Sequence, residues 1–279
     1  MQISPRYDGP AIVVMDGAAD DQAVPTARQR NRLGSLLAGL SAAEWATASR
    51  CDGWTVQDVV AHLVGVNQFF EFSVRGGLAG APTKMLQNFD PVATPSAGVQ
   101  SMKGQTPAAV LAQYVESNRS FLAAINGLTD AQWMMTAESP AGHVPLRYVA
   151  QHALWDCWTH ERDIAIPLGR TPEIEQDELL SCLRYAAAIS PALALGSGHA
   201  ITGTFTVVTT DPVVTLVVDV SDVVAVRADR APAEAPLLQG SAVEVVEALT
   251  IRAPMPPTTP PEWRHLLTGL ATAFDTVPQ

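Results

Sequence analysis

The sequence predicts an α+β protein, with a four-helix bundle in its N-terminal part followed by a smaller α+β domain. Two observations support this prediction. Up to about residue 190, apolar residues recur at helical spacing in long segments that Gly and Pro separate. From about residue 200, short β-branched segments alternate with turn residues, which is typical of strands. We therefore expect a bundle domain over 22–190 and a small α+β domain over 200–279.

Start and stop residues mark the four helices of the expected bundle. The helices are expected to begin near Pro25, Thr55, Thr106 and Pro145. Thr55 is the clearest start, because Asp58 three residues later completes a capping-box pattern. Thr106 can cap the third helix, with Pro107 at its first position. Glycines follow the second and fourth helices, at 76–77 and 169.

The remaining segments have more varied patterns. The first twenty residues have the composition of a loose arm, and residues 78–105 are rich in Gly, Pro and Thr, which predicts a long loop. Such loops often contact substrate, although many are simply mobile. One more helix is expected at about 173–188. The C-terminal part is expected to contain strands at 202–210, 212–220 and 223–229 and helical stretches at 235–252 and 261–277.

Composition and charge favour small-molecule partners. Hydrophobic residues make up 47% of the chain and charged residues 16%, which is typical of a globular protein. The formal charge is 17 minus 28, or −11, and no run of Lys or Arg offsets it locally. Nucleic acid and anionic membranes are therefore not expected as partners.

The cysteines and the N-terminus point to the cytoplasm. Cys51, Cys157 and Cys182 are odd in number and widely spaced, without a CxxC pair. The first residues lack the basic head and apolar run of an export signal, and no apolar stretch is expected to reach membrane-spanning length. We expect a reduced, cytoplasmic protein.

One helix carries three potential metal ligands. His152, Asp156 and His160 follow one another at four-residue intervals, so neighbouring members lie on the same face. Asp156 and His160 can approach a single ion, whereas His152 and His160 are separated by roughly 12 Å along the helix axis. A third ligand must come from another helix, and His62, beside the inward stripe of the second helix, is the best candidate.

Spacing alone leaves two interpretations of these residues. Two histidines and one carboxylate are a common set in reactive metal centres. A histidine on an apolar stripe is, however, more often a hydrogen-bonded core residue. His152 could support a ligand or line the pocket, and Cys157 is turned about 100° from Asp156 on the helix, which favours packing over metal ligation.

Two signatures in the sequence resemble a known family. The segments are CDGWTVQDVVAHLVGVNQFF, which contains His62, and WDCWTHERDIAIPLG, which contains Asp156 and His160. They are similar, in this order, to the signatures of the mycothiol-dependent maleylpyruvate isomerase family within the DinB-like metalloenzyme superfamily. The resemblance spans about residues 25–170, and the C-terminal part resembles the small domain often attached to this family.

The resemblance implies a DinB-like bundle that holds a divalent ion, usually zinc, through His62, Asp156 and His160. It also implies mycothiol as a thiol cosubstrate. Arg252 matches an Arg of the family and is expected to bind a carboxylate of substrate or thiol; a surface Arg at a helix end is an equal alternative. His152 and Arg252 are thus the candidate catalytic residues. Asp163 is expected to orient a neighbour or to pair with Arg162 or Arg170.

The function that follows is a metal-dependent thiol transferase or isomerase of mycothiol-dependent type. A divalent metal binds a thiol as thiolate beside an electrophilic substrate. Two alternatives remain: a DinB-like metalloenzyme of secondary metabolism with non-thiol chemistry, and a regulator that binds metal or thiol without turnover.

Overall fold

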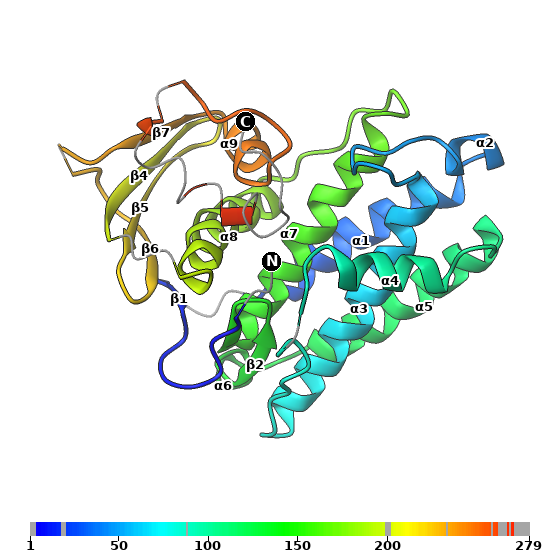
Figure 1. Ribbon diagram of the computed structural model, residues 1–279, viewed down its shortest axis with the longest axis horizontal. Helices are drawn as coiled ribbons and strands as arrows, with labels where there is room; N and C mark the ends of the chain where they lie inside the picture. Colours follow the sequence, from blue (N-terminus) through cyan, green and yellow to red (C-terminus); the bar gives the residue numbers. More distant parts are fainter. Residues whose placement is uncertain are drawn as a thin grey trace.

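The computed structural model describes residues 4–17, 21–87, 89–198, 202–232, 234–257, 259–261, 267 and 269–270. It combines a helical part with a twisted sheet (Figure 1). The long helices of the helical part are α1 (Ala23–Ala38), α3 (Val56–Leu78), α5 (Pro107–Ile125) and α7 (Leu146–Ala165). The shorter ones are α2 (Ala42–Trp45), α4 (Ala93–Ser101) and α6 (Asp130–Trp133). A hairpin of β2 (Thr136–Ser139) and β3 (Gly142–Pro145) precedes α7.

The helix starts follow the capping residues of the sequence. The Thr55 side chain accepts a hydrogen bond from the Asp58 amide at 3.3 Å, and the Asp58 carboxylate accepts one from the Thr55 amide at 3.0 Å. This reciprocal pair confirms the predicted capping box. The Thr106 side chain accepts a hydrogen bond from the Ala109 amide at the start of α5, whose first residue is Pro107. Each interaction satisfies amides that a helix leaves unpaired at its N-terminus.

Apolar side chains fix how the four long helices pack. α3 lies against α5 and α7, and α1 lies against the same two helices. Leu33, Leu63 and Tyr114 come from α1, α3 and α5 and are fully buried in one cluster with Ile164 of α7. Burial of such side chains stabilises the fold by roughly 1.5–3 kcal/mol each.

The sheet contains β1 (Val13–Met15), β4 (Gly203–Thr210), β5 (Val213–Val220), β6 (Val224–Ala228) and β7 (Leu237–Gly240). Its strand order is β1-β6-β5-β4-β7, with antiparallel pairing among β4, β5 and β6 and parallel pairing at both edges. The expected strands at 202–210, 212–220 and 223–229 are therefore confirmed. β7 and the helix α9 (Ala242–Leu249) divide the stretch that the sequence predicted as one helix.

Helix α8 (Gln176–Gly196) lies between the sheet and α7 (Figure 1). It is longer than the predicted 173–188, and by length and composition alone it could cross a membrane. The expectation that no segment reaches spanning length was therefore wrong. Because 78% of the most apolar 18-residue stretch of α8 is buried inside the structure, packing against the sheet and α7 accounts for the apolar composition of this helix.

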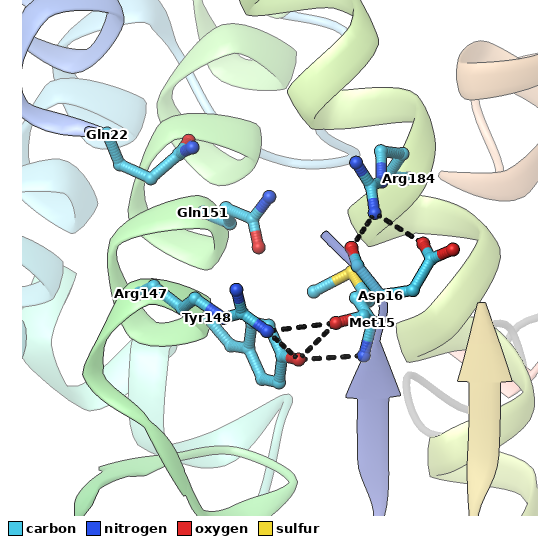
Figure 2. Close-up of a pocket in the computed structure, with 7 residues that line it drawn as sticks. All are labelled: Met15, Asp16, Gln22, Arg147, Tyr148, Gln151 and Arg184. Carbon is cyan, nitrogen blue, oxygen red and sulfur yellow. Dashed lines mark hydrogen bonds and ion pairs between the residues drawn. The ribbon is translucent and has the colours of Figure 1, made fainter. Parts of the chain in front are cut away.

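The N-terminal arm is part of the sheet. β1 pairs in parallel with β6, with Val13 opposite Val224. Side chains of α7 and α8 converge on this strand (Figure 2): Tyr148 bonds to both the amide and the carbonyl of Met15, and Arg184 pairs with Asp16 at 3.0 Å. The cavity among them has a volume of about 10 Å³, which is the size of one water molecule. The hydrogen bonds around this cavity therefore anchor the arm, and the cavity itself has no room for a substrate.

Two further expectations differ from the structure, and a third falls largely outside the residues that the structure describes. Residues 1–20 were expected to be loose, but Val13–Met15 form β1. The sequence did not indicate this strand because its partner β6 lies far away in the chain. The segment 78–105 contains α4, which has weak helical patterning and packs on α3. The helical stretch expected at 261–277 lies largely outside the described residues.

Two glycines of α3 should respond oppositely to replacement by alanine. A Cβ at Gly77 would lie 2.6 Å from the Thr136 carbonyl oxygen, so Gly77→Ala should destabilise the protein by about 1–3 kcal/mol. A Cβ at the exposed Gly65 would meet nothing within 4 Å, so Gly65→Ala should stabilise it by about 0.5–1 kcal/mol. Urea unfolding of both variants measures this difference, and shifts of the same sign would contradict the packing of α3 on β2.

Candidate metal centre

Two helices supply the residues of the candidate centre. His62 lies on α3, and Asp156 and His160 lie one turn apart on α7. α3 and α7 are in contact along this face, so the three side chains meet in the interior of the helical part. Their exposed fractions are only 11–15%.

The three side chains present their ligand atoms to one point. Asp156 Oδ1 lies 3.9 Å from His62 Nε2 and 3.7 Å from His160 Nε2. The two imidazole rings are 4.9 Å apart at an angle of 77°. These separations are too long for hydrogen bonds. Two atoms that each bind one zinc ion at about 2.0–2.2 Å can be at most about 4.4 Å apart, so both measured distances suit donors to a shared ion.

A buried oxygen without a partner supports the same interpretation. Asp156 Oδ2 is shielded from solvent and accepts no hydrogen bond in the structure. Burying a carboxylate oxygen in this way is costly unless another positive group compensates it. The residues present therefore fit a divalent cation, which would compensate this charge.

Electrostatics keep the carboxylate ionised. Burial by itself would raise the pKa of Asp156, but the neighbouring His160 and His62 hold that pKa well below its ordinary value. Burial lowers the pKa of His62. Burial also disfavours the charged form of His160, yet Asp156, Cys51 and Asp163 together raise the pKa of His160 well above its ordinary value. The centre thus attracts positive charge, in the form of a proton or a metal ion.

The second nitrogen of His160 is also engaged. Its Nδ1 lies 3.0 Å from Oδ2 of Asp163, a fully buried residue one turn further along α7. The Cys51 thiol donates to the same oxygen at 3.2 Å and lies 3.7 Å from His160 Nδ1. Because Nδ1 faces Asp163, Nε2 is the nitrogen of His160 that faces Asp156 and His62, and it would bind a metal ion once its proton is displaced.

Arg252 closes this group from the chain segment after α9. Its Nε and Nη2 donate to the two oxygens of Asp163 at 2.9 and 2.8 Å. Nη1 donates to the carbonyl of Thr250, and Nη2 also approaches Cys51 Sγ at 3.5 Å. All three guanidinium nitrogens are therefore occupied by groups of the protein.

A family model described as the mycothiol maleylpyruvate isomerase N-terminal domain matches residues 26–165, which include all three candidate ligands. The chain belongs to this family. No curated protein matches the sequence.

Two solved structures share the fold of this family member. One is the crystal structure of the mycothiol-dependent maleylpyruvate isomerase, with 15% sequence identity and a TM-score of 0.61. The other is a mutant of that isomerase in which one histidine is replaced by alanine, with 16% identity and a TM-score of 0.60. Each comparison covers 85% of this chain and 91% of the other. Since the family model covers residues 26–165, the shared architecture extends beyond the N-terminal domain of the family.

In this member of the maleylpyruvate isomerase family, the side chain of His152 does not join the three candidate ligands. His152 Nδ1 is 2.6 Å from the hydroxyl of Tyr185 on α8, and its ring packs against Phe70 and Trp155. Burial lowers the pKa of His152 from 6.5 to about 4, so the ring is neutral in the folded protein at pH 7. His152 occupies the interior one turn from Asp156, as its spacing on the helix requires.

Sequence reasoning missed Cys51 and only partly described Asp163. Asp163 was expected to orient a neighbour, and its three-residue spacing from His160 already carried that signal. Its expected partners Arg162 and Arg170 instead pair with Glu247 and Glu44. Cys51 lies 109 residues from His160, so nothing in its local sequence indicated a histidine neighbour.

The buried His152 should make the metal-free protein sensitive to acid. The unfolded chain takes up a proton on this residue near pH 6.5, whereas the folded protein does so only near pH 4. The free energy of unfolding should therefore fall as the pH drops from 6.5 to 4, by at most about 3 kcal/mol from this residue. His152→Leu should flatten this part of the profile, as measured by urea unfolding at several pH values.

Tyr185→Phe is the matched control for that measurement. It removes the hydrogen bond to His152 but leaves the ring buried, so the pH dependence should persist. An unchanged slope in His152→Leu would show that burial of this ring does not determine acid sensitivity.

Proposed function

We propose that this protein is a metal-dependent enzyme that uses a low-molecular-weight thiol, mycothiol, to isomerise a small-molecule substrate or to transfer sulfur to it. The observation that carries this proposal is the convergence of His62, Asp156 and His160, in which one buried oxygen of Asp156 has no hydrogen-bond partner. Membership of the mycothiol maleylpyruvate isomerase family supports the choice of thiol and reaction class. We further propose that the protein is cytoplasmic, because its three cysteines are free thiols.

We also propose that α1, α3, α5 and α7 form a DinB-like four-helix bundle around the metal. The packing of α1 and α3 against α5 and α7 supports this arrangement. Residues 22–190 and 200–279 then act as a metal-binding domain and a smaller α+β domain. The pairing of β1 with β6 would add the N-terminal arm to the second domain.

The donor set suits zinc, which commonly binds two histidines and one carboxylate in catalytic sites. A divalent ion held by these residues would lower the pKa of a thiol and favour its nucleophilic thiolate form. Asp156 contributes the negative charge of the centre, and Asp163 keeps the proton of His160 on Nδ1. The surrounding helices exclude water from most of the site, which strengthens these interactions.

The cosubstrate thiol supplies the sulfur in this proposal. Cys157 and Cys182 are fully buried, and burial raises the pKa of both thiols. A buried thiol with a raised pKa is a poor nucleophile. Neither residue is therefore suited to replace mycothiol in the reaction.

Metal content should depend on the three candidate ligands. Wild-type protein should contain near-stoichiometric zinc, and His62→Ala, Asp156→Ala and His160→Ala should each lose it, because each removes one of three protein donors. Elemental analysis of identically purified proteins measures this. His143→Ala is the control, because His143 bonds to the carbonyl of Thr83 outside the centre. Metal-free wild type after reconstitution would overturn the proposed centre.

Thiol binding should change the spectrum of the cobalt-substituted protein. Mycothiol should produce a new thiolate-to-cobalt absorption band, and turnover of maleylpyruvate should require both metal and mycothiol. A cobalt spectrum unchanged by every cellular thiol would favour a metalloenzyme with non-thiol chemistry. Thiol binding without turnover of any electrophile would favour a regulator.

A further inference from the structure

We propose that Arg252 is a positioning residue: it acts through Asp163 to fix the ring of His160, so the segment after α9 sets the metal affinity of the helical part. This inference rests on the proposed metal centre. It assigns Arg252 a role different from the carboxylate binding that the sequence suggested.

Asp163 can hold His160 only if its own charge is compensated. The carboxylate is completely buried, and its Oδ2 accepts from both His160 and Cys51. Arg252 makes a two-point contact with both of its oxygens, whereas Arg50 Nε lies 3.6 Å from Oδ1. Two-point contacts between guanidinium and carboxylate groups restrict orientation as well as supplying charge. Without Arg252, the carboxylate would keep one more distant cation and could rotate away from His160.

The backbone directs Arg252 toward Asp163. Ile251 adopts a φ of 57°, a left-handed conformation that β-branched residues rarely take. This residue follows Thr250, the C-cap of α9, and turns the chain, so that the amides of Arg252 and Ala253 both donate to the carbonyl of Glu247. The Nη1 contact with Thr250 fixes the guanidinium further. Such a strained residue persists only where the surrounding structure holds it in place.

A separate set of charges keeps α9 attached to the helical part. Glu247 of α9 accepts from Arg162 at 2.6 Å and pairs with Arg50. Arg162 also lies over the ring of Trp158. The contacts with Glu247 do not involve the Arg252 side chain, and Arg50 reaches only the backbone carbonyl of Arg252, so we expect α9 to stay in place when the Arg252 side chain is replaced. Arg162 offers a matched control, because its side chain also reaches across to α9 but pairs with Glu247 and not with Asp163.

The test is a double-mutant cycle on zinc affinity, measured by competition with a chromophoric chelator. Removing the hydrogen-bond partner of a metal-bound histidine typically weakens metal binding 10–100-fold. Arg252→Met should therefore weaken zinc binding about tenfold, and Asp163→Ala at least as much. If Arg252 acts through Asp163, the double variant should bind zinc as Asp163→Ala does. Arg162→Gln should keep the wild-type affinity.

Arg252→Lys keeps the positive charge but loses the two-point contact, so it should weaken zinc binding less than tenfold. This variant keeps the test informative if Arg252→Met does not fold. Unchanged zinc affinity in Arg252→Met or Arg252→Lys, together with a raised KM, would overturn the inference in favour of substrate binding. Multiplying effects in the double variant, or an equal loss in Arg162→Gln, would overturn it in favour of general destabilisation. Failure of the wild type to bind zinc would overturn both the inference and the proposed metal centre.

Discussion

The contact between α3 and α7 is the constraint on which the candidate centre depends. His62 comes from one helix and Asp156 and His160 from the other, so their distances follow from how closely the two helices pack. Fully buried Val59 and Leu63 flank His62 on α3, and fully buried Cys157 and Ile164 lie on α7. Close-packed side chains of this kind tolerate little displacement. The hydrophobic core thus fixes the distances among the polar side chains of the candidate centre.

Buried charges in this protein connect segments that are far apart in the sequence. Asp163 joins α7 to Cys51 before α3 and to Arg252 after α9. Glu138 of β2 is also completely buried and accepts from Tyr7, Thr83 and the amides of Met85 and Leu86. An unpaired carboxylate in either place would be costly. Each carboxylate therefore holds its partners in position, one around the candidate centre and the other at the N-terminal arm and the long segment after α3.

The sheet supports the helical part from one side. α8 packs on α7 with one face and on the sheet and α9 with others, which explains why most of its residues are buried. The chain segment beyond α9 then returns to the helical part and reaches Asp163. The sheet and its helices therefore place Arg252 where it neutralises a charge at the end of α7.

The sequence by itself determined the features that depend on neighbouring residues. Thr55 with Asp58, and Thr106 with Pro107, defined two helix starts, and the four-residue spacing placed Asp156 and His160 on one face. The tertiary structure decided what depends on distant residues: the approach of His62 to Asp156, the pairing of Val13 with Val224, and the meeting of Cys51 and Arg252 at Asp163. Caps and helix periodicity arise from contacts within a few residues, whereas these contacts form only when the core brings separate elements together.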